Sequence, residues 1–187
     1  MDDRVLIAAA RRGDKAAFEK LMGAYSKKVY NYALRLTDDV GRAEDLCQEA
    51  FVKAFLGILS FHEKAAFSTW IYRIVHNTFI DSTRKAVPGS GRYDETLDDR
   101  GADIQEISSQ RFHDQLRQIE NANWLTQGLA RLPEPFRSVV ILRDIQDLSY
   151  EEIAAITDTS VGTVKSRLSR GREQLRHILS SIDPDHG

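Results

Sequence analysis

The sequence has few of the residues that build covalent or metal-bound frameworks. Its 187 residues contain one cysteine, Cys47, which cannot form a disulfide within the chain and provides no cysteine-rich metal framework. The 5 histidines show no metal-ligand spacing, and neither a glycine-rich phosphate loop nor a nucleophile motif is present. We therefore expect no metal, no cofactor and no enzymatic activity.

An excess of one charge and long apolar runs are also absent. The chain carries 26 Lys and Arg against 28 Asp and Glu, and a formal net charge of -2 argues against a uniformly basic nucleic-acid binder. No apolar stretch approaches the roughly 20 residues that span a bilayer, and the first residues do not resemble a signal peptide. These absences predict a soluble, cytoplasmic protein without a membrane span, in which any DNA contact comes from local basic patches.

Strand-like alternation is missing as well, whereas apolar residues recur at helical spacing over most of the chain. The pattern predicts an all-α fold with helices over approximately 3–11, 14–36, 40–59, 67–86, 109–131, 134–146, 149–157 and 161–180. Pro88, Gly89 and Gly91 break this pattern, and many acidic residues follow them. We therefore expect two small helical domains, residues 1–87 and 111–187, joined by an acidic flexible linker over 88–110.

The densest group of basic residues is SVGTVKSRLSRGREQLR, residues 160–176. Ser149, followed by Glu151 and Glu152, predicts the start of a short helix, and a second helix departs near Val161. Two helices at this spacing are typical of a helix-turn-helix. The second helix has one apolar stripe, with a glycine where another helix can approach closely: Val164, Leu168, Gly171, Leu175 and Ile178.

The other face of this second helix indicates DNA binding. Ser166, Ser169, Arg170 and Glu173 share it, and Lys165, Arg167, Arg172 and Arg176 flank it. Side chains near the start of such a helix reach base edges in the major groove, and Thr163 with the helix N-terminus can hold a phosphate. A solvated cationic helix in a bundle is the alternative. The short helix and turn that precede it favour DNA recognition.

The segment RAEDLCQEAFVKAFLGI predicts an amphipathic helix. Its expected buried arc is Cys47, Ala50, Phe51, Ala54, Phe55 and Ile58. Its other face aligns acids and an amide with apolar side chains: Asp45, Gln48, Glu49, Val52 and Leu56. Such a mixture is typical of a protein-binding face. It is equally consistent with Leu56 packing on a neighbouring helix and the acids being solvated.

The segment LSFHEKAAFSTWIYRIVHNTFIDSTRK is the most aromatic part of the chain. Most of its apolar side chains are expected in a core: Phe67, Trp70, Ile71, Ile74, Val75 and Phe79. Its polar side is expected to carry Arg73, His76, Asn77 and Arg84, with Phe61 in the preceding loop. Aromatics beside cations and an amide suit single-stranded DNA, and Phe61 and Asn77 are the best candidates to contact a base.

Three motifs in this order resemble one known family. AEDLCQEAFVKAF, FSTWIYRIVHN and LPEPFRSVVILRDIQDLSYEEIAAITDTSVGTVKSRLSRGREQLR together are closely similar to a group IV, or extracytoplasmic function (ECF), sigma factor of bacterial RNA polymerase, a member of the sigma-70 family. The resemblance covers nearly the whole chain apart from the linker and the last few residues. It implies a sigma-2-like domain over 1–87 and a sigma-4-like domain over 111–187.

The resemblance also implies partners and site residues. The face with Asp45, Gln48 and Glu49 corresponds to the contact with the clamp helices of core polymerase, and residues around Phe136 and Val140 to the flap contact. Minus-10 promoter DNA, with a flipped base, would meet Phe61 and Asn77, with Arg73 and His76 near the strand. The minus-35 element would meet Lys165, Ser166, Ser169 and Arg170. Members of this family are commonly held inactive by an anti-sigma factor.

Two other classes of binding protein remain possible from the sequence. A helix-turn-helix regulator without polymerase contacts would explain residues 149–176 but not the α-helical face that contains Leu56. Such a regulator would also usually need dimer symmetry. An interaction protein could instead bind an acidic partner with its basic helix.

Overall fold

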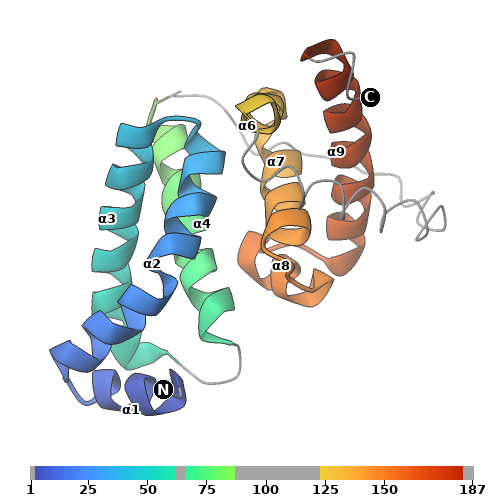
Figure 1. The fold of residues 1–187 in the computed structure, drawn as a ribbon. Coiled ribbons are helices and arrows are strands. Elements are labelled where there is room, and N and C mark those ends of the chain that lie inside the picture. Colours follow the sequence, from blue (N-terminus) through green and yellow to red (C-terminus); the bar gives the residue numbers. More distant parts are fainter. Residues whose placement is uncertain (1–2, 62–65, 87–122, 183–187) are drawn as a thin grey trace. The chain divides into compact units, whose positions relative to one another are not determined.

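The computed structural model describes residues 3–61, 66–86 and 123–182. All regular elements in these ranges are helical, so the expected all-α fold is confirmed. The chain divides into two compact units, Met1–Pro88 and Gly89–Gly187 (Figure 1). The linker expected over 88–110 and the first turns of the helix expected from 109 lie outside the described residues.

The first unit begins with α1 (Asp3–Arg11), α2 (Lys15–Thr37) and α3 (Val40–Gly57). A single 3-10 turn, η1 (Ile58–Ser60), ends α3, and α4 (Phe67–Ala86) follows. Figure 1 shows α2, α3 and α4 running alongside one another, with α1 across one end near η1. The arrangement is a three-helix bundle closed at one end by a short helix.

Aspartates define the helix ends in this unit. Asp14 accepts a hydrogen bond from the backbone N–H of Ala17 at 3.0 Å, and Asp39 accepts one from that of Arg42 at 2.7 Å. Such N-caps stabilise a helix by about 0.5–2 kcal/mol each, because they pair backbone donors that the helix leaves free. Asp38 ends α2 in the left-handed conformation at φ 52°. The turn between α2 and α3 is therefore specified by two adjacent aspartates.

The core of the first unit combines large side chains on α2 and α4 with small ones on α3. Its central members are Leu21, Val29, Tyr32, Leu36, Ala43, Cys47, Ala50, Ala54, Ile71, Val75 and Phe79. Cys47 is buried, as expected, and burial raises the pKa of its thiol to about 11. A thiol in this environment behaves as a small apolar core group rather than as a redox centre.

The second unit contains α6 (Asn123–Arg131), α7 (Glu134–Val140), the π-helical turn η2 (Ile141–Ile145), α8 (Tyr150–Thr157) and α9 (Val161–Ile182). The longest of these, α9, packs against α6, α7 and α8. Ser149 and Glu152 form a capping box at the start of α8, as the sequence indicates. The side chain of Ser160 accepts a hydrogen bond from the backbone N–H of Thr163 at 3.0 Å and so caps α9.

One expected helix is different in the structure. The spacing predicts a continuous helix over 134–146, but α7 ends at Val140 and continues as the wider turn η2. There the backbone N–H of Gln146 donates to the carbonyl of Ile141, and that of Leu148 to the carbonyl of Leu142. Such a π turn inserts an extra residue into the helix and rotates the side chains that follow it. Asp144, within the turn, becomes fully buried.

In the part of the chain that the structure describes, no helix has the length and apolar character needed to cross a membrane.

Candidate protein and nucleic-acid interfaces

The mixed face of α3 is exposed over its whole length. It consists of Asp45, Gln48, Glu49, Val52 and Leu56, and we call these residues the α3 face. Val52 is 59% exposed and Leu56 72% exposed. Leu56 therefore does not pack on a neighbouring helix among the described residues. Glu49 forms an exposed ion pair with Lys53 at 2.8 Å, a contact of the kind that contributes little to stability.

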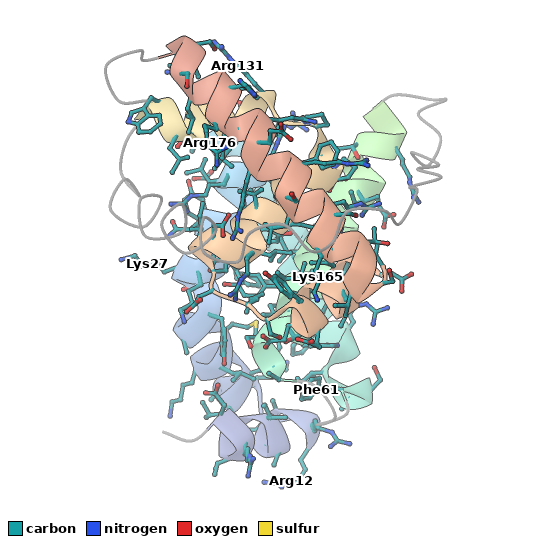
Figure 2. All side chains as sticks on the ribbon, turned by 90° about the vertical axis from the view of Figure 1, so that its right-hand side faces the viewer. Arg12, Lys27, Phe61, Arg131, Lys165 and Arg176 are labelled. Carbon is teal, nitrogen blue, oxygen red and sulfur yellow. The ribbon has the colours of Figure 1, made fainter. Side chains whose placement is uncertain are left out.

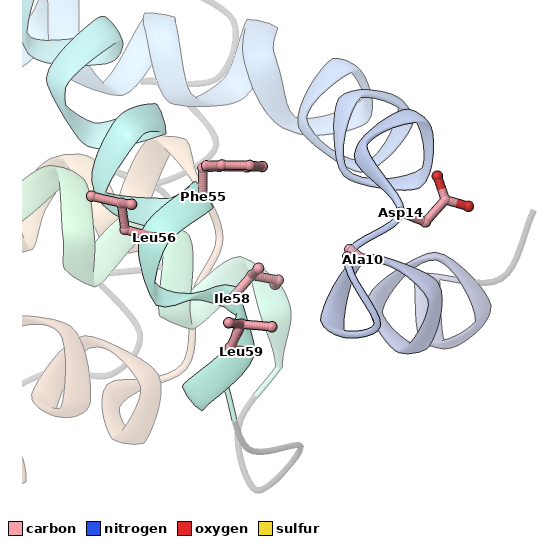
Figure 3. Close-up of a pocket in the computed structure, with 7 residues that line it drawn as sticks. Ala10, Asp14, Phe55, Leu56, Ile58 and Leu59 are labelled. Atoms are coloured by element: carbon pink, nitrogen blue, oxygen red, sulfur yellow. The ribbon is translucent and has the colours of Figure 1, made fainter.

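The α3 face continues into a small apolar hollow (Figure 3). Its volume is about 180 Å³ and it is lined by Ala10, Gly13, Asp14, Phe55, Leu56, Ile58 and Leu59. Figure 3 shows Ile58 and Leu59 directed toward Ala10, where α1 turns into α2. An apolar surface of this kind beside carboxylates is typical of a protein-binding site.

Phe55 lies on this surface, so the expectation that it belongs to the core is wrong. Its side chain is 43% exposed and contacts Phe18 edge-to-face, with ring centroids 5.2 Å apart. The buried line runs instead through Ala50 and Ala54 of α3 and on to Ile58 of η1. Residue 55 lies about 100° around the helix from residue 54, which places it at the edge of the buried stripe.

The structure also corrects the position of Phe61. Its side chain is 2% exposed and belongs to an aromatic cluster, with ring centroids 5.6 Å from Phe67 and 5.1 Å from Trp70. Phe67 in turn contacts Tyr25 at 5.2 Å. Phe61 follows η1 directly, and η1 turns the chain so that this ring enters the core. In this conformation Phe61 is not accessible to a DNA base.

His76 is likewise in the core rather than on the polar side of α4. Its Nδ1 atom lies 3.3 Å from the hydroxyl oxygen of Tyr32, and the side chain is buried. The buried stripe of α4 includes Tyr72, Val75 and Phe79, and position 76 falls within it. The ring therefore contacts α2 and is not presented to a strand of DNA.

Arg73 and Asn77 are exposed, as expected. They lie four residues apart on α4, which places them on one face one turn from each other. Arg84, two turns further along, is exposed as well. Of the candidates for a single-stranded DNA contact, these side chains are the ones that are exposed.

The predicted helix-turn-helix is confirmed in α8 and α9. The two helices are joined by Asp158, Thr159 and Ser160, and Asp158 takes the left-handed conformation at φ 53°. The buried stripe of α9 is Val164, Leu168, Gly171, Leu175 and Leu179, so Leu179 replaces the expected Ile178 at its last position. A Cβ atom at Gly171 would lie 2.9 Å from Cγ2 of Val140, which explains why a glycine occupies this close approach.

The polar side chains of α9 differ in accessibility. Lys165, Ser169 and Arg170 are exposed, whereas Thr163, Ser166 and Arg167 are half-buried. The hydroxyl of Ser166 donates to the carbonyl oxygen of Thr163 at 3.0 Å. The Lys165 ammonium lies 5.8 Å from the centre of the Tyr150 ring, a cation–π contact that restricts this long side chain (Figure 2). The exposed residues form a cationic and hydroxyl-bearing surface on the first three turns of α9.

The structure also corrects the expected position of the Arg172 side chain on α9. The sequence places it beside the DNA-binding face, but its guanidinium forms a bidentate ion pair with the buried carboxylate of Asp144. The Nε–Oδ2 distance is 3.0 Å and the Nη2–Oδ1 distance 2.5 Å. The partners lie 28 residues apart in the sequence, so helical periodicity carries no signal for their pairing.

The described residues contain no group of three or more His, Cys, Asp or Glu side chains that could hold a metal ion. The arrangement instead offers two candidate binding surfaces, one on each unit. One is the apolar and acidic α3 face with its hollow, and the other, which we call the basic face of α9, consists of the exposed Lys165, Ser169 and Arg170.

Two family models match the chain. The model described as sigma-70 region 2 matches residues 21–87, and the model described as sigma-70, region 4 matches residues 122–175. The first match contains the α3 face and α4, and the second contains the helix-turn-helix.

Similarity to individual proteins extends over almost the full chain. The sequence is 36% identical over 179 residues to the ECF RNA polymerase sigma factor SigW of Bacillus subtilis (strain 168), covering 94% of this chain and 96% of that protein. It is also 36% identical over 194 residues to the ECF RNA polymerase sigma-E factor of Escherichia coli (strain K12), covering 97% and 96%.

Solved structures share the fold. CnrH, in complex with the cytosolic domain of CnrY, has a TM-score of 0.68 at 23% identity, with coverage of 96% of this chain and 97% of that chain. The sigma factor RpoE from Bartonella quintana, in complex with the anti-sigma factor NepR, has a TM-score of 0.66 at 25% identity, with coverage of 89% and 98%.

Proposed function

Since the chain belongs to the ECF group of the sigma-70 family, whose members are transcription initiation factors, we propose that one of its surfaces binds core RNA polymerase and that others bind promoter DNA. Residues 1–87 act as the sigma-2-like domain and 111–187 as the sigma-4-like domain. One observation carries this proposal. The α3 face and the basic face of α9 are both exposed, and they lie on two units that each have their own core.

The α3 face is the proposed polymerase contact. When a partner covers exposed apolar side chains, the complex is stabilised by about 25 cal/mol per Å² of apolar surface removed from water. Val52 and Leu56 supply that surface, and Asp45, Gln48 and Glu49 supply the charge and hydrogen bonds that select the partner. The clamp helices of core polymerase are the proposed partner of this face, and the flap is the proposed partner of the second unit.

On α4, Arg73 and Asn77 are the proposed contacts to the melted minus-10 strand. A side-chain amide can hydrogen-bond the edge of an unpaired base, and the guanidinium one turn away can neutralise a phosphate. Phe61 and His76 support this surface from inside the core in the free protein, and are not proposed to touch DNA in this conformation.

On α9, the proposed minus-35 contacts are Thr163, Lys165, Ser166, Arg167, Ser169 and Arg170. The exposed Lys165, Ser169 and Arg170 are placed to meet the duplex first, because side chains near the start of a recognition helix reach base edges and flanking cations reach phosphates. Ser160 and Thr163 lie at the helix N-terminus, where the backbone N–H groups other than that of Thr163, which donates to Ser160, favour a phosphate.

Control by an anti-sigma factor is part of the proposal. The Bartonella quintana relative was solved with such a protein, and the apolar hollow beside the α3 face is available to a protein partner here. The proposed location is the cytoplasm, where polymerase and promoter are found. The protein contributes binding energy rather than bond-making chemistry, because stacking and hydrogen bonds to unpaired bases offset the few kcal/mol that strand separation costs.

Run-off transcription with bacterial core polymerase on genomic fragments tests the proposal. We expect discrete start sites that appear only when the protein is added, and these sites define its promoter. Lys165→Ala and Arg170→Ala should weaken minus-35 binding and lower the salt dependence of binding by about one phosphate contact each. Absence of new start sites, combined with tight binding of the protein alone to particular duplexes, would identify a conventional regulator instead.

A further inference from the structure

We propose that Asp144 and Arg172 are positioning residues whose buried ion pair sets the rotation of α9 about its own axis. That rotation determines which side chains of α9 point into the major groove. The inference rests on the proposed minus-35 function of α9 and adds residues that do not themselves contact DNA.

The geometry of the pair fixes the orientation of both side chains. Asp144 is 0% exposed and the Arg172 side chain 11% exposed, and two parallel N–H···O bonds connect them. A guanidinium bonded through both Nε and Nη2 has one orientation relative to the carboxylate plane. Neither group can rotate without breaking a charge-assisted hydrogen bond in a water-excluded site.

Stability alone does not account for this pair. Removing two charges from water costs several kcal/mol per ion, and apolar side chains of similar volume often give equal or greater stability. An ion pair, unlike an apolar contact, also fixes the relative orientation of its two groups. Such a contact is useful where the orientation of a helix matters as much as its attachment.

The buried apolar stripe of α9 fixes its rotation approximately, and the ion pair fixes it further at the point where α9 and α7 are closest. Gly171 lies against Val140 and Phe136 of α7, so α9 approaches α7 closely at a residue without a side chain to interlock. Arg172 is the next residue and supplies the interlock. Lys165, two turns earlier and on the same side of the helix, rests over the Tyr150 ring of α8. Asp144 of η2 thus holds α9 by an ion pair, and Tyr150 of α8 contacts the same side of α9 two turns away.

The π turn is what brings Asp144 into this position. Asp144 lies inside η2, between the buried Leu142 and the loop that leads to α8. The guanidinium of Arg143, its neighbour, donates to the carbonyl of Leu148 at 2.9 Å and holds that loop. A change in the turn would therefore move Asp144, and with it the rotation of α9.

The test uses the full-length protein with core polymerase at a promoter identified by run-off transcription. The readout is the selectivity ratio: initiation at that promoter divided by initiation at versions with a single minus-35 base pair changed. Partial unfolding lowers both terms equally, so a purely structural role does not change this ratio. The variants are Arg172→Lys, which keeps the charge but loses the bidentate fork, and the double change Asp144→Leu with Arg172→Met, which replaces the pair by apolar groups.

We expect the selectivity ratio to fall at least about fivefold in both variants, the lower end of what one well-placed base contact contributes. The matched control is Arg131→Lys, the same change at an exposed position of the same unit, which should leave the ratio unchanged (Figure 2). The salt dependence of binding should also stay unchanged in Arg172→Lys, because Arg172 neutralises Asp144 and not a phosphate.

Either variant with an unchanged ratio, while folded, would overturn the inference. If the double variant does not fold, Arg172→Lys decides, because it leaves the buried carboxylate paired with a cation. Failure of the wild-type protein to initiate at all would contradict the proposed function instead, so the two failures are distinguishable.

Discussion

At the scale of single residues, burial separates side chains that the sequence treats as equivalent. Phe61 and Asn77 are equal candidates for a base contact, yet Phe61 is inside an aromatic cluster and Asn77 is exposed. Arg170 and Arg172 belong to one basic segment, yet the guanidinium of Arg172 is paired with the buried carboxylate of Asp144. Residue type predicts the chemistry that a side chain can perform, and its surroundings decide whether that chemistry is available.

Cys47 should be unreactive in the folded protein. Its thiol is buried and its pKa is raised to about 11, so little thiolate exists at pH 8 and reagents cannot reach it. The rate of modification by a water-soluble alkylating reagent should be low in buffer and should rise to that of a free cysteine in denaturant. Fast modification in buffer, measured by mass spectrometry, would show that α3 opens readily.

Gly171→Ala should destabilise the second unit by about 1–3 kcal/mol, because overpacking forces neighbouring atoms apart. The added Cβ would lie 2.9 Å from Cγ2 of Val140, 3.2 Å from Cβ of Phe136 and 3.4 Å from the carbonyl oxygen of Phe136. Urea denaturation followed by circular dichroism measures the change.

The matched control is Gly23→Ala in the interior of α2, where an added Cβ meets nothing within 4 Å. It should stabilise the first unit by about 0.5–1 kcal/mol, because alanine favours the helix over glycine. Equal effects of the two substitutions would mean that α7 and α9 are not packed closely at Gly171.

At the scale of elements, helices with one buried stripe leave other faces free for partners. α3 buries small residues such as Ala43, Ala50 and Ala54, and presents Val52 and Leu56 to solvent. α9 buries an apolar stripe and presents Lys165 and Arg170 on another face. Each helix therefore has one face in the core and a different face that is exposed to its proposed partner.

Val52→Ala combined with Leu56→Ala should weaken polymerase binding about 10- to 100-fold, which corresponds to about 1.4–2.8 kcal/mol. The free energy of unfolding should change by less than about 0.5 kcal/mol for each residue, because both side chains are exposed. Competition against a labelled wild-type protein for core polymerase gives the affinity.

Val40→Ala is the control for this pair, since Val40 is an exposed valine on the same helix outside the α3 face. It should leave polymerase affinity unchanged. A loss of affinity equal to that of the double variant would place the contact elsewhere on the first unit.

At the scale of the whole molecule, each unit contains its own apolar core and its own proposed binding surface. The first unit is a helical bundle with the α3 face and α4, and the second holds the helix-turn-helix. If both proposed surfaces bind, the covalent connection makes the second binding event intramolecular, so the intact chain should bind the promoter complex more tightly than either unit alone.

The two units should fold when expressed separately, as residues 1–88 and 89–187, because each buries a core of its own. Each should show a helical circular dichroism spectrum and a cooperative thermal transition. An equimolar mixture should nevertheless fail to initiate at concentrations where the intact protein does, since the units then bind independently. Initiation by the mixture at full efficiency would show that the connection contributes no affinity.

The sequence by itself determined the all-α class, most helix boundaries and the helix-turn-helix, whereas it left open whether Leu56 of the α3 face is exposed. These features depend on local signals: helical periodicity, capping residues such as Ser149, and glycine at a close approach. They are encoded within a few helical turns, so no knowledge of distant residues is needed.

Only the tertiary structure decided the burial of Phe61 and His76, the exposure of Phe55, and the pairing of Asp144 with Arg172. Each depends on which helix packs against which, through contacts between residues far apart in the chain. The tertiary structure also decided the π turn at η2, which places Asp144 where it contacts α9. Periodicity predicts that a helix has a buried face, but the edges of that face are set by the neighbours that cover it.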